Sequence, residues 1–385
     1  MRSPLAMAWA MAGLGVCSLF SAAAAADCRW PAWERFRDTY VSAEGRVVDA
    51  AGTPPQRSVS EGQAYALFFA LVADDRETFA RLLRWTETEM AAGDLTAHLP
   101  AWLWGRRDDD GWGVLDDNAA SDADLWIAYA LAEAGQRWNQ RHYRVLSALF
   151  GRVIHRDEVR TLPGLGPTLL PAPRGFDDAP GQWRLNPSYV PLQVLRGLDR
   201  LQPGAGWAGL LPSSRRLLLE SAPAGFAPDW ARYDTARGFI HDDKSERDGY
   251  DGSYDAIRVY LWAGMLDAGD PDRAALLARY RPMADATAKN GAPPEFLRSD
   301  TGAQRGTGNA SFSASLLPLL RTLDMNDALD AQRRRVDAAD VGARADAYFG
   351  NVLTLFGRGW DEGWFRFAAD GRLIVRDRER CEALP

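Results

Sequence analysis

The feature that most limits the fold of this chain is a succession of helical segments that follow one another in pairs. In each segment apolar residues recur at positions i, i+3 and i+4, and Gly or Pro marks the ends, which is the pattern of helices. The predicted pairs are 61–73 with 76–91, 122–133 with 138–153, 188–201 with 210–221, 255–266 with 272–287, and 309–320 with 326–336, followed by 343–356. Strand pairs are rare, and the segment 365–375 is expected to form a short hairpin around Asp370-Gly371.

Nothing in the sequence divides these pairs into separate domains. There is no Gly/Ser linker and no low-complexity tract, so residues 27–385 are expected to form one domain. The spacing of the pairs is irregular, whereas solenoid repeats have a fixed period. An all-α toroid of helical hairpins, an (α/α)6 barrel, is therefore favoured over an α-solenoid. The stretches 162–185 and 225–252 are expected to be long loops that form a cleft at one end of it.

Residues 1–26 have the pattern of a secretory signal peptide. Arg2 precedes an apolar run over 5–20, and Ala24-Ala25-Ala26 provides a small-residue cleavage site after Ala26. An uncleaved anchor is the alternative, but an apolar run that ends in alanines is a weak membrane span. The mature chain is therefore expected to be periplasmic or secreted and to have no membrane span.

Export also changes the interpretation of the cysteines. Cleavage removes Cys17 and leaves Cys28 and Cys381, one near each end of the mature chain. In an oxidising compartment two remaining cysteines suggest one disulfide that joins the N-terminal segment to the C-terminal tail. Two unpaired thiols are the alternative.

Charge and motif content exclude several classes of function. The chain has 45 Lys and Arg against 52 Asp and Glu, a net charge of −7, whereas nucleic-acid-binding proteins usually present a basic face. The four His residues are scattered without metal-ligand spacing, and neither a P-loop nor a Gly-x-Ser-x-Gly motif is present. We therefore expect no metal, no other cofactor and no nucleic-acid partner.

Three acidic residues, Glu61, Asp122 and Asp255, each lie at the start of a different predicted helix. Taken singly they are explained by helix capping, since Ser58-x-x-Glu61 and Ser121-x-x-Asp124 have the pattern of capping boxes. Taken together, and embedded among Trp and Tyr, they are typical of a polysaccharide cleft. Cleavage of a glycosidic bond needs one carboxylic acid and one carboxylate on either side of it.

The 15 Trp residues fit the same interpretation. Aromatic rings stack on the apolar faces of sugar rings, so loop aromatics are candidate substrate platforms. We expect Trp102 to be the first of these, with Tyr189 and Trp230 next. Three tryptophans on predicted helices are expected to pack in the core instead: Trp85, Trp126 and Trp138.

Several separated motifs resemble one known family. The segment 120–138, which begins Ala-Ser-Asp-Ala-Asp, is similar to the signature of glycoside hydrolase family 8. The segments 60–65 (Ser-Glu-Gly-Gln-Ala-Tyr) and 253–258 (Ser-Tyr-Asp-Ala-Ile-Arg) resemble those that carry the acid and the base of that family. Further motifs resemble the periplasmic endoglucanases of bacterial cellulose-synthase operons, and they lie at 30–33, 99–105, 186–189 and 227–230. The resemblance becomes vague after about residue 321.

The resemblance implies an (α/α)6 barrel and an inverting endo-β-1,4-glucanase that acts on β-1,4-glucan during cellulose biosynthesis, with the cellulose-synthase complex as a candidate partner. It assigns the general acid to Glu61, the general base to Asp255 and substrate positioning to Asp122. Tyr254 and Arg258 would orient Asp255 or the sugar.

The chemistry of the reaction predicts the surroundings of Glu61 and its distance from Asp255. A general acid must be protonated near neutral pH, whereas a helix N-terminus favours the charged form. Glu61 is therefore expected to be mostly buried and close to another carboxylate, Asp122. For inversion, its carboxyl group should lie about 6.5–9.5 Å from that of Asp255. Asp251 is a second candidate base.

Two other functions remain open at this point. One is a non-catalytic glucan-binding or scaffolding subunit of the export machinery, although the complete acid and base set disfavours this. The other is the same chemistry on xylan or chitosan. Chitosan would favour additional acids along the cleft, and the candidates are Asp116, Asp117, Asp248 and Asp251.

Overall fold

Helices arranged in a ring make up most of the computed structural model, which describes residues 28–53, 55–339, 348–377 and 381–385. Within these residues the helices are α1 (Pro31–Tyr40), α2 (Ser60–Val72), α3 (Arg76–Trp85), α4 (Ser121–Arg137), α5 (Arg141–Asp157), α6 (Leu192–Leu201), α7 (Leu211–Glu220), α8 (Ala256–Gly264), α9 (Arg273–Asn290), α10 (Ala310–Thr322), α11 (Asn326–Ala338) and α12 (Tyr348–Asp361). The predicted signal peptide and residues 343–347 of the last predicted helix lie outside the described residues.

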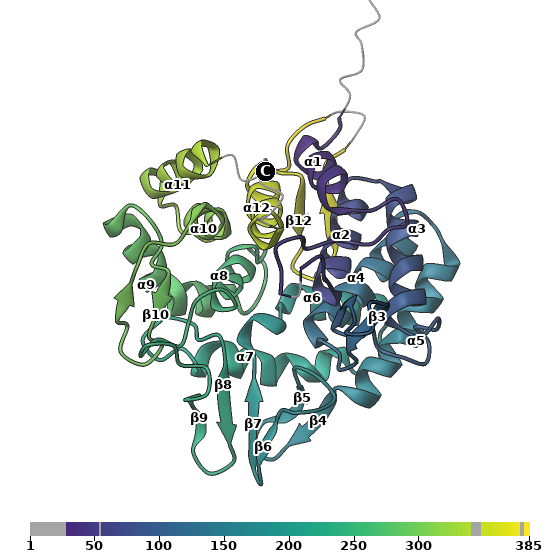
Figure 1. Cartoon of the computed structure of the whole chain (residues 1–385). Helices are drawn as coiled ribbons and strands as arrows, with labels where there is room; N and C mark the ends of the chain where they lie inside the picture. Colours follow the sequence, from purple (N-terminus) through teal and green to yellow (C-terminus); the bar gives the residue numbers. More distant parts are fainter. Residues whose placement is uncertain (1–27, 54, 340–347, 378–380) are drawn as a thin grey trace, which may run out of the picture.

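The even-numbered helices form the inner layer of the ring, and their composition explains why. Nearly every residue of α2, α4 and α8 is buried, which suits helices surrounded by other helices. By contrast, α3 and α5 have one buried and one exposed face, as outer helices should. Contacts run from α2 to α4 and on to α6, and from α8 to α10 and on to α12. Figure 1 shows the ring returning to α1 and α2 beside α12. The predicted (α/α)6 barrel is confirmed.

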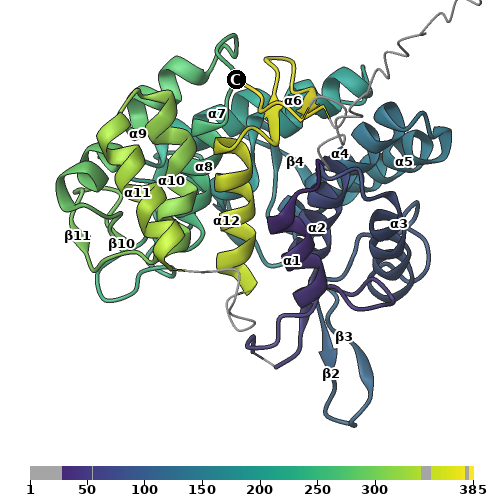
Figure 2. The ribbon, with the colours of Figure 1, turned by 90° about the horizontal axis from the view of Figure 1, so that it is seen from above.

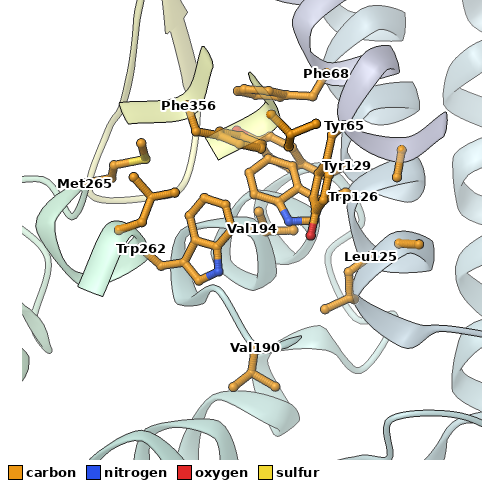
Figure 3. Packing of buried hydrophobic residues seen from close by; sticks show 14 of the residues in the cluster. Tyr65, Phe68, Leu125, Trp126, Tyr129, Val190, Val194, Trp262, Met265 and Phe356 are labelled. Atoms are coloured by element: carbon orange, nitrogen blue, oxygen red, sulfur yellow. The ribbon is translucent and has the colours of Figure 1, made fainter. Parts of the chain in front are cut away.

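Aromatic side chains from three inner helices pack around Phe356 of α12 at the centre of the ring (Figure 3). The ring of Phe356 lies 5.4 Å from Phe68 on α2, 5.3 Å from Trp126 on α4 and 5.0 Å from Trp262 on α8, measured between centroids. Such packing fills the centre of the barrel with side chains. A substrate site must therefore lie at an end of the barrel, where loops and helix termini meet.

Most predicted helices match observed ones, with two differences at the N-terminal side. The helix α1 was not predicted. It packs its apolar face inward and begins with Pro31, a favoured first residue. The predicted segment 76–91 is divided: α3 ends at Trp85, and Thr86–Met90 continues as a π-helical turn.

Short strands lie within the segments that connect the helices. They are β1 (Ser58–Val59), β2 (Leu103–Arg106), β3 (Trp112–Asp116), β4 (Val159–Leu162), β5 (Gly166–Leu169), β6 (Asp177–Ala179), β7 (Gln182–Leu185), β8 (Ala231–Asp234), β9 (Gly238–His241), β10 (Phe296–Leu297), β11 (Gln304–Arg305), β12 (Phe365–Phe367) and β13 (Leu373–Val375). The predicted hairpin at 365–375 is confirmed as β12 and β13. In Figure 2 the hairpin of β2 and β3 stands out from the helical body.

The interpretation of 162–185 and 225–252 as loops was wrong in part. These stretches form a four-stranded antiparallel sheet in the order β6-β7-β8-β9. Its central pair joins segments far apart in the chain, with Leu185 opposite Ala231. Each strand has only three or four residues, so the local pattern does not reveal them. The sheet matters for the site, because β7 ends just before Asn186 and β8 begins just after Trp230.

The two ends of the described chain are covalently joined. Cys28 and Cys381 form a disulfide, with their Cα atoms 5.3 Å apart. Cys28 lies shortly before α1, which packs on α12, so the bond lies where the first and last helices of the ring meet. Of the helices within the described ranges, none is both long and apolar enough to cross a membrane.

Candidate active site

The three carboxylates lie at the N-terminal ends of three inner helices. Glu61 and Asp122 are the second residues of α2 and α4, and Asp255 immediately precedes α8. Because successive hairpins of an (α/α)6 barrel repeat the same direction, the inner helices share one polarity, and their N-termini meet at one end. The fold thus gathers residues that are far apart in the sequence.

The side chain of Glu61 faces a loop aromatic instead of capping its own helix. Its Oε1 accepts a hydrogen bond from Trp102 Nε1 at 3.3 Å. The residue before α2 is Val59, and no side-chain cap is formed there. The hydroxyl of Ser58 donates instead to the carbonyl oxygen of Val47, at 2.5 Å. The capping box predicted for Ser58 and Glu61 is therefore not formed.

The surroundings of Glu61 favour its protonated form. Glu61 has intermediate exposure and is mostly buried, as predicted. Removal from water raises the pKa of Glu61 to about 8, and the negative charge of Asp122 adds to this effect. Smaller opposing effects come from a hydrogen bond with its own backbone N–H, from Arg258 and from Trp102. Glu61 is thus protonated at neutral pH, as a general acid must be.

Arg258 connects the other two carboxylates beneath the site. Its Nη1 donates to Asp122 Oδ2 at 2.7 Å and to the Tyr65 hydroxyl at 2.8 Å, while its Nη2 donates to Asp255 Oδ1 at 2.7 Å. The Tyr65 hydroxyl in turn donates to Asp122, at 3.1 Å. The side chains of Arg258 and Asp122 are only 5% and 1% exposed, so the ion pair between these two groups is shielded from water.

Asp255 is the carboxylate that remains accessible. Its side chain is 33% exposed, and its Oδ2 accepts a hydrogen bond from Asn186 Nδ2 at 3.2 Å. Arg258 and Asn186 therefore hold one oxygen each and fix the plane of the carboxyl group. An accessible carboxylate held in one orientation is suited to accept a proton from water.

Asp229 fixes the backbone that carries Asp255. One oxygen, Asp229 Oδ1, accepts from the backbone N–H groups of Ser253 at 2.8 Å, Asp255 at 3.0 Å and Ala256 at 2.8 Å. N–H groups at the start of a helix have no partner within it. Burial and the charge of Asp255 raise the pKa of Asp229 to about 7, against the effect of these hydrogen bonds.

Replacing Asp229 by Ala is expected to lower the free energy of unfolding by about 1–3 kcal/mol, because three N–H groups lose their acceptor. It should also lower kcat by about one to two orders of magnitude with little change in KM, because Asp255 loses its position. Urea unfolding and steady-state kinetics measure both effects. Asp229→Asn keeps the Oδ1 acceptor and is the matched control. Equal losses in the two variants would contradict a role through the acceptor atom.

The predicted aromatic platforms lie beside these carboxylates. Trp102 contacts Glu61 as described. Tyr189 lies under the Arg258 guanidinium, 5.5 Å from ring centroid to Cζ, and burial, together with the charges of Asp122, Glu61 and Asp255, raises its pKa well above the ordinary value. Trp230 follows at 6.0 Å from Tyr189. The three tryptophans that were predicted to pack in the core are buried: Trp85, Trp126 and Trp138.

Tyr254 lies away from the Arg258 network, on the wall of a neighbouring cavity. Its side chain is 40% exposed and packs against Phe312 at 5.0 Å between ring centroids. The cavity has a volume of about 500 Å³ and is lined also by Tyr348 and by the Asp49–Arg57 ion pair. The Tyr348 hydroxyl on this wall lies against Gly62, the residue that follows Glu61.

Asp251, the second candidate base, is engaged elsewhere. It is buried and accepts hydrogen bonds from the Ser299 backbone N–H at 2.8 Å and the Ser299 hydroxyl at 2.5 Å. Its other neighbour is His241, whose Nδ1 lies 3.0 Å away. His241, Asp243 and Glu246 also bring one potential metal ligand each within 4.8 Å of one another, a grouping that sequence spacing does not show. Both ring nitrogens of His241 already face carboxylates.

Tyr65, Asn186 and Asp229 were not predicted to be site residues. All three lie within motifs that the sequence made visible, at 60–65, 186–189 and 227–230. Their partners, however, are on other elements, and a sequence gives no sign of a contact between α2 and α8 or between two loops. Polar residues next to Pro or Trp in these motifs were the available signal.

Comparisons with known proteins agree with this geometry. A family model described as Glycosyl hydrolases family 8 matches residues 2–363. The endoglucanase of Salmonella typhi is 48% identical over 358 residues, 93% of this chain and 94% of that protein. The endoglucanase of Xanthomonas axonopodis pv. citri (strain 306) is 49% identical over 365 residues, 94% of each.

A solved structure is similar over the whole fold. The endo-1,4-D-glucanase of Vibrio fischeri ES114 matches with a TM-score of 0.86 and 44% identity, covering 90% of this chain and 99% of that one. The endo-beta-1,4-glucanase of Acetobacter xylinum matches with a TM-score of 0.67 and 26% identity, over 85% of this chain and 96% of that one. The chain therefore belongs to glycosyl hydrolase family 8, as its motifs predicted, and is a glycoside hydrolase that groups with the family's endoglucanases.

Proposed function

We propose that this protein is an inverting endo-β-1,4-glucanase. The observation that carries the proposal is the pairing of a protonated carboxyl group, Glu61, with an accessible carboxylate, Asp255, at one end of the barrel. One acid and one base are what hydrolysis of a glycosidic bond requires. The endoglucanases to which the chain is similar support the choice of β-1,4-glucan.

In the proposed reaction Glu61 donates its proton to the glycosidic oxygen as the bond to the anomeric carbon breaks. Asp255 takes a proton from a water molecule on the opposite face of the sugar ring, and the remaining hydroxide bonds to the anomeric carbon. The products are two shorter chains, and the new reducing end has the inverted, α configuration. Each carboxyl group then returns to its starting state by exchanging one proton with water.

The remaining residues hold these two groups and the sugar. Asp122 keeps the pKa of Glu61 high through its negative charge and anchors Arg258, which orients Asp255. We assign Asp122 to the position where the sugar ring distorts. Its carboxyl oxygens already accept from Arg258, Tyr65 and the Ala123 N–H, so its effect on the sugar is electrostatic and local.

The aromatic residues are the proposed sugar platforms. Trp102 contacts Glu61, while Tyr189 and Trp230 lie toward the four-stranded sheet, so rings lie on more than one side of the carboxylates. Tyr254, the residue before Asp255, lines a further cavity together with Tyr348. A surface that continues past the cleavage point on both sides suits cleavage within a polymer.

We further propose that the enzyme acts outside the cytoplasm and trims β-1,4-glucan during cellulose export, where the cellulose-synthase complex is a partner. The signal-peptide pattern at 1–26 and the disulfide between Cys28 and Cys381 support an exported protein. The motifs shared with endoglucanases of cellulose-synthase operons support the biosynthetic role.

A substrate panel tests the activity. Reducing ends released from carboxymethylcellulose, mixed-linkage glucan, xylan and chitosan should be highest for the β-1,4-glucans, with viscosity falling faster than reducing ends appear. Proton NMR of the first product should show the α anomer. Preference for xylan or chitosan would overturn the substrate, the β anomer would overturn inversion, and glucan binding without hydrolysis would indicate a scaffolding subunit.

The pH profile is a separate prediction. Activity requires the proton on Glu61, and its pKa is raised to about 8, so kcat/KM should fall tenfold per pH unit above about pH 8. The folded enzyme also holds this proton where the unfolded chain has lost it, so stability decreases as pH rises from the ordinary Glu value towards 8. Initial rates on a soluble glucan across the pH range measure the alkaline midpoint. A midpoint near the ordinary Glu pKa would contradict the assignment of the acid.

A further inference from the structure

Two carboxyl groups that the proposed reaction does not use are fully buried close to the site. Asp124 is in the first turn of α4, two residues after Asp122, and Glu158 is the residue that follows α5. Both residues have 0% exposure. Acidic residues are almost never buried so completely unless a partner compensates them.

Within the described part of the chain, the two side chains have only each other as partners. The two carboxyl groups act on one another where α4 packs on α5. Among the described residues, no other N–H or O–H group donates to any of their four carboxyl oxygens. Ionised carboxylates are acceptors only, so a hydrogen bond between these two groups requires a proton on at least one of them.

We infer that Asp124 and Glu158 form a proton-sharing carboxyl pair that positions the first turn of α4, and with it Asp122, without adding negative charge beside the catalytic groups. The charged groups that face the pair are themselves acids. Asp122 and Glu61 act on Asp124, and Asp122 and Asp157 act on Glu158. Together with burial, these charges raise the pKa of both members well above their ordinary values.

The pair links α4, which carries Asp122, to the junction between α5 and the β4–β5 hairpin. The backbone oxygen of Glu158 accepts from the Leu170 N–H at 2.8 Å, so Glu158 is fixed at the junction of α5 with the β4–β5 hairpin. Asp124 continues this link into α4, whose Ala123 N–H donates to Asp122 at 2.9 Å. The positioning role rests on the proposed function, whereas the shared proton does not.

Unfolding measurements test the shared proton without any assay of activity. The variant Asp124→Asn with Glu158→Gln replaces the pair by amides that are neutral at every pH. Each proton that the folded protein alone retains makes the unfolding constant rise tenfold per pH unit. Between pH 6 and 9 the unfolding constant rises by some factor for each pH unit. That factor should be at least ten times larger for the wild type than for the double variant. Equal slopes would overturn the inference. The control carries the same changes at exposed sites, Glu77→Gln with Asp285→Asn.

An infrared measurement on the wild-type protein tests the shared proton even if the double variant does not fold. At pH 9 Glu61 and Asp229 have mostly lost their protons, given pKa values of about 8 and about 7. A carbonyl band of protonated carboxyl groups that persists at this pH supports the pair. Its disappearance along with that of Glu61 would overturn the inference.

Kinetics test the positioning role. Glu158→Ala removes the partner of Asp124 and should lower kcat about tenfold with KM unchanged, whereas Glu158→Gln should restore most of the rate. In the double amide variant the alkaline midpoint of kcat/KM should stay where it is in the wild type, because one neutral pair replaces another. A full rate in Glu158→Ala, or a lowered midpoint in the double variant, would overturn the positioning role. If the enzyme had no activity on any glycan, the unfolding result would still stand.

Discussion

Replacing Glu61 by Gln is expected to lower kcat/KM on β-1,4-glucan by about 10³-fold, within the range of general acid catalysis. Gln keeps the size of the side chain and a hydrogen-bond acceptor for Trp102, but it has no proton to give to the glycosidic oxygen. The affinity for glucan should persist, because the aromatic platforms are unchanged. Rates on carboxymethylcellulose and a glucan pull-down measure the two effects separately.

A substrate whose leaving group needs no proton shows whether Glu61 acts as an acid. An aryl cello-oligosaccharide with an acidic phenol departs without protonation, so the loss in Glu61→Gln should shrink to about tenfold or less on that substrate. Glu77→Gln, the same change at an exposed position in the first turn of α3, is the control and should keep the wild-type rate. A uniform loss on both substrates would point to a structural role for Glu61 instead.

Replacing Asp255 by Asn is expected to cost about 10³-fold or more in kcat on every substrate, activated or not. Water must be deprotonated whichever group leaves, so this loss should not depend on the leaving group. The new amide keeps an oxygen for Arg258, and the buried ion pair between Arg258 and Asp122 remains, so the fold should survive. Comparison of kcat on polymer and on the aryl substrate measures the effect.

Two variants control this result. Asp285→Asn, on the exposed face of α9, should leave the rate unchanged. Asp251→Asn separates the two candidate bases: with its oxygens directed to Ser299 and His241, it should keep kcat within about tenfold of the wild type. If Asp251→Asn lost as much as Asp255→Asn, the assignment of the base would be wrong.

The helical ring was predictable because its signal is local. Each inner helix carries its own apolar pattern, and the alternation of helix and turn limits how the helices can pack. The four-stranded sheet was not predictable in the same way. Its strands are short, and the central pair, β7 and β8, comes from stretches far apart in the sequence.

The carboxyl groups that do the chemistry were predictable from the sequence, whereas the residues that hold them in place were less so. The requirement for a protonated acid led to the expectation that Asp122 lies near Glu61, and the raised pKa agrees with it. The position of Asp229 was not foreseen, because its acceptor role depends on loop geometry at the start of α8. Equally, no spacing rule pairs Asp124 with Glu158, which are joined only by the packing of α4 on α5.

Because Cys28 is bonded to Cys381, the backbone between them is a closed covalent loop with a sequence separation of 353 residues. Any single cut in a surface segment of that loop leaves all twelve labelled helices in one molecule. The disulfide therefore closes the backbone covalently around the same circuit that the helices follow. A chain nicked by a protease would therefore keep both halves of its active site attached.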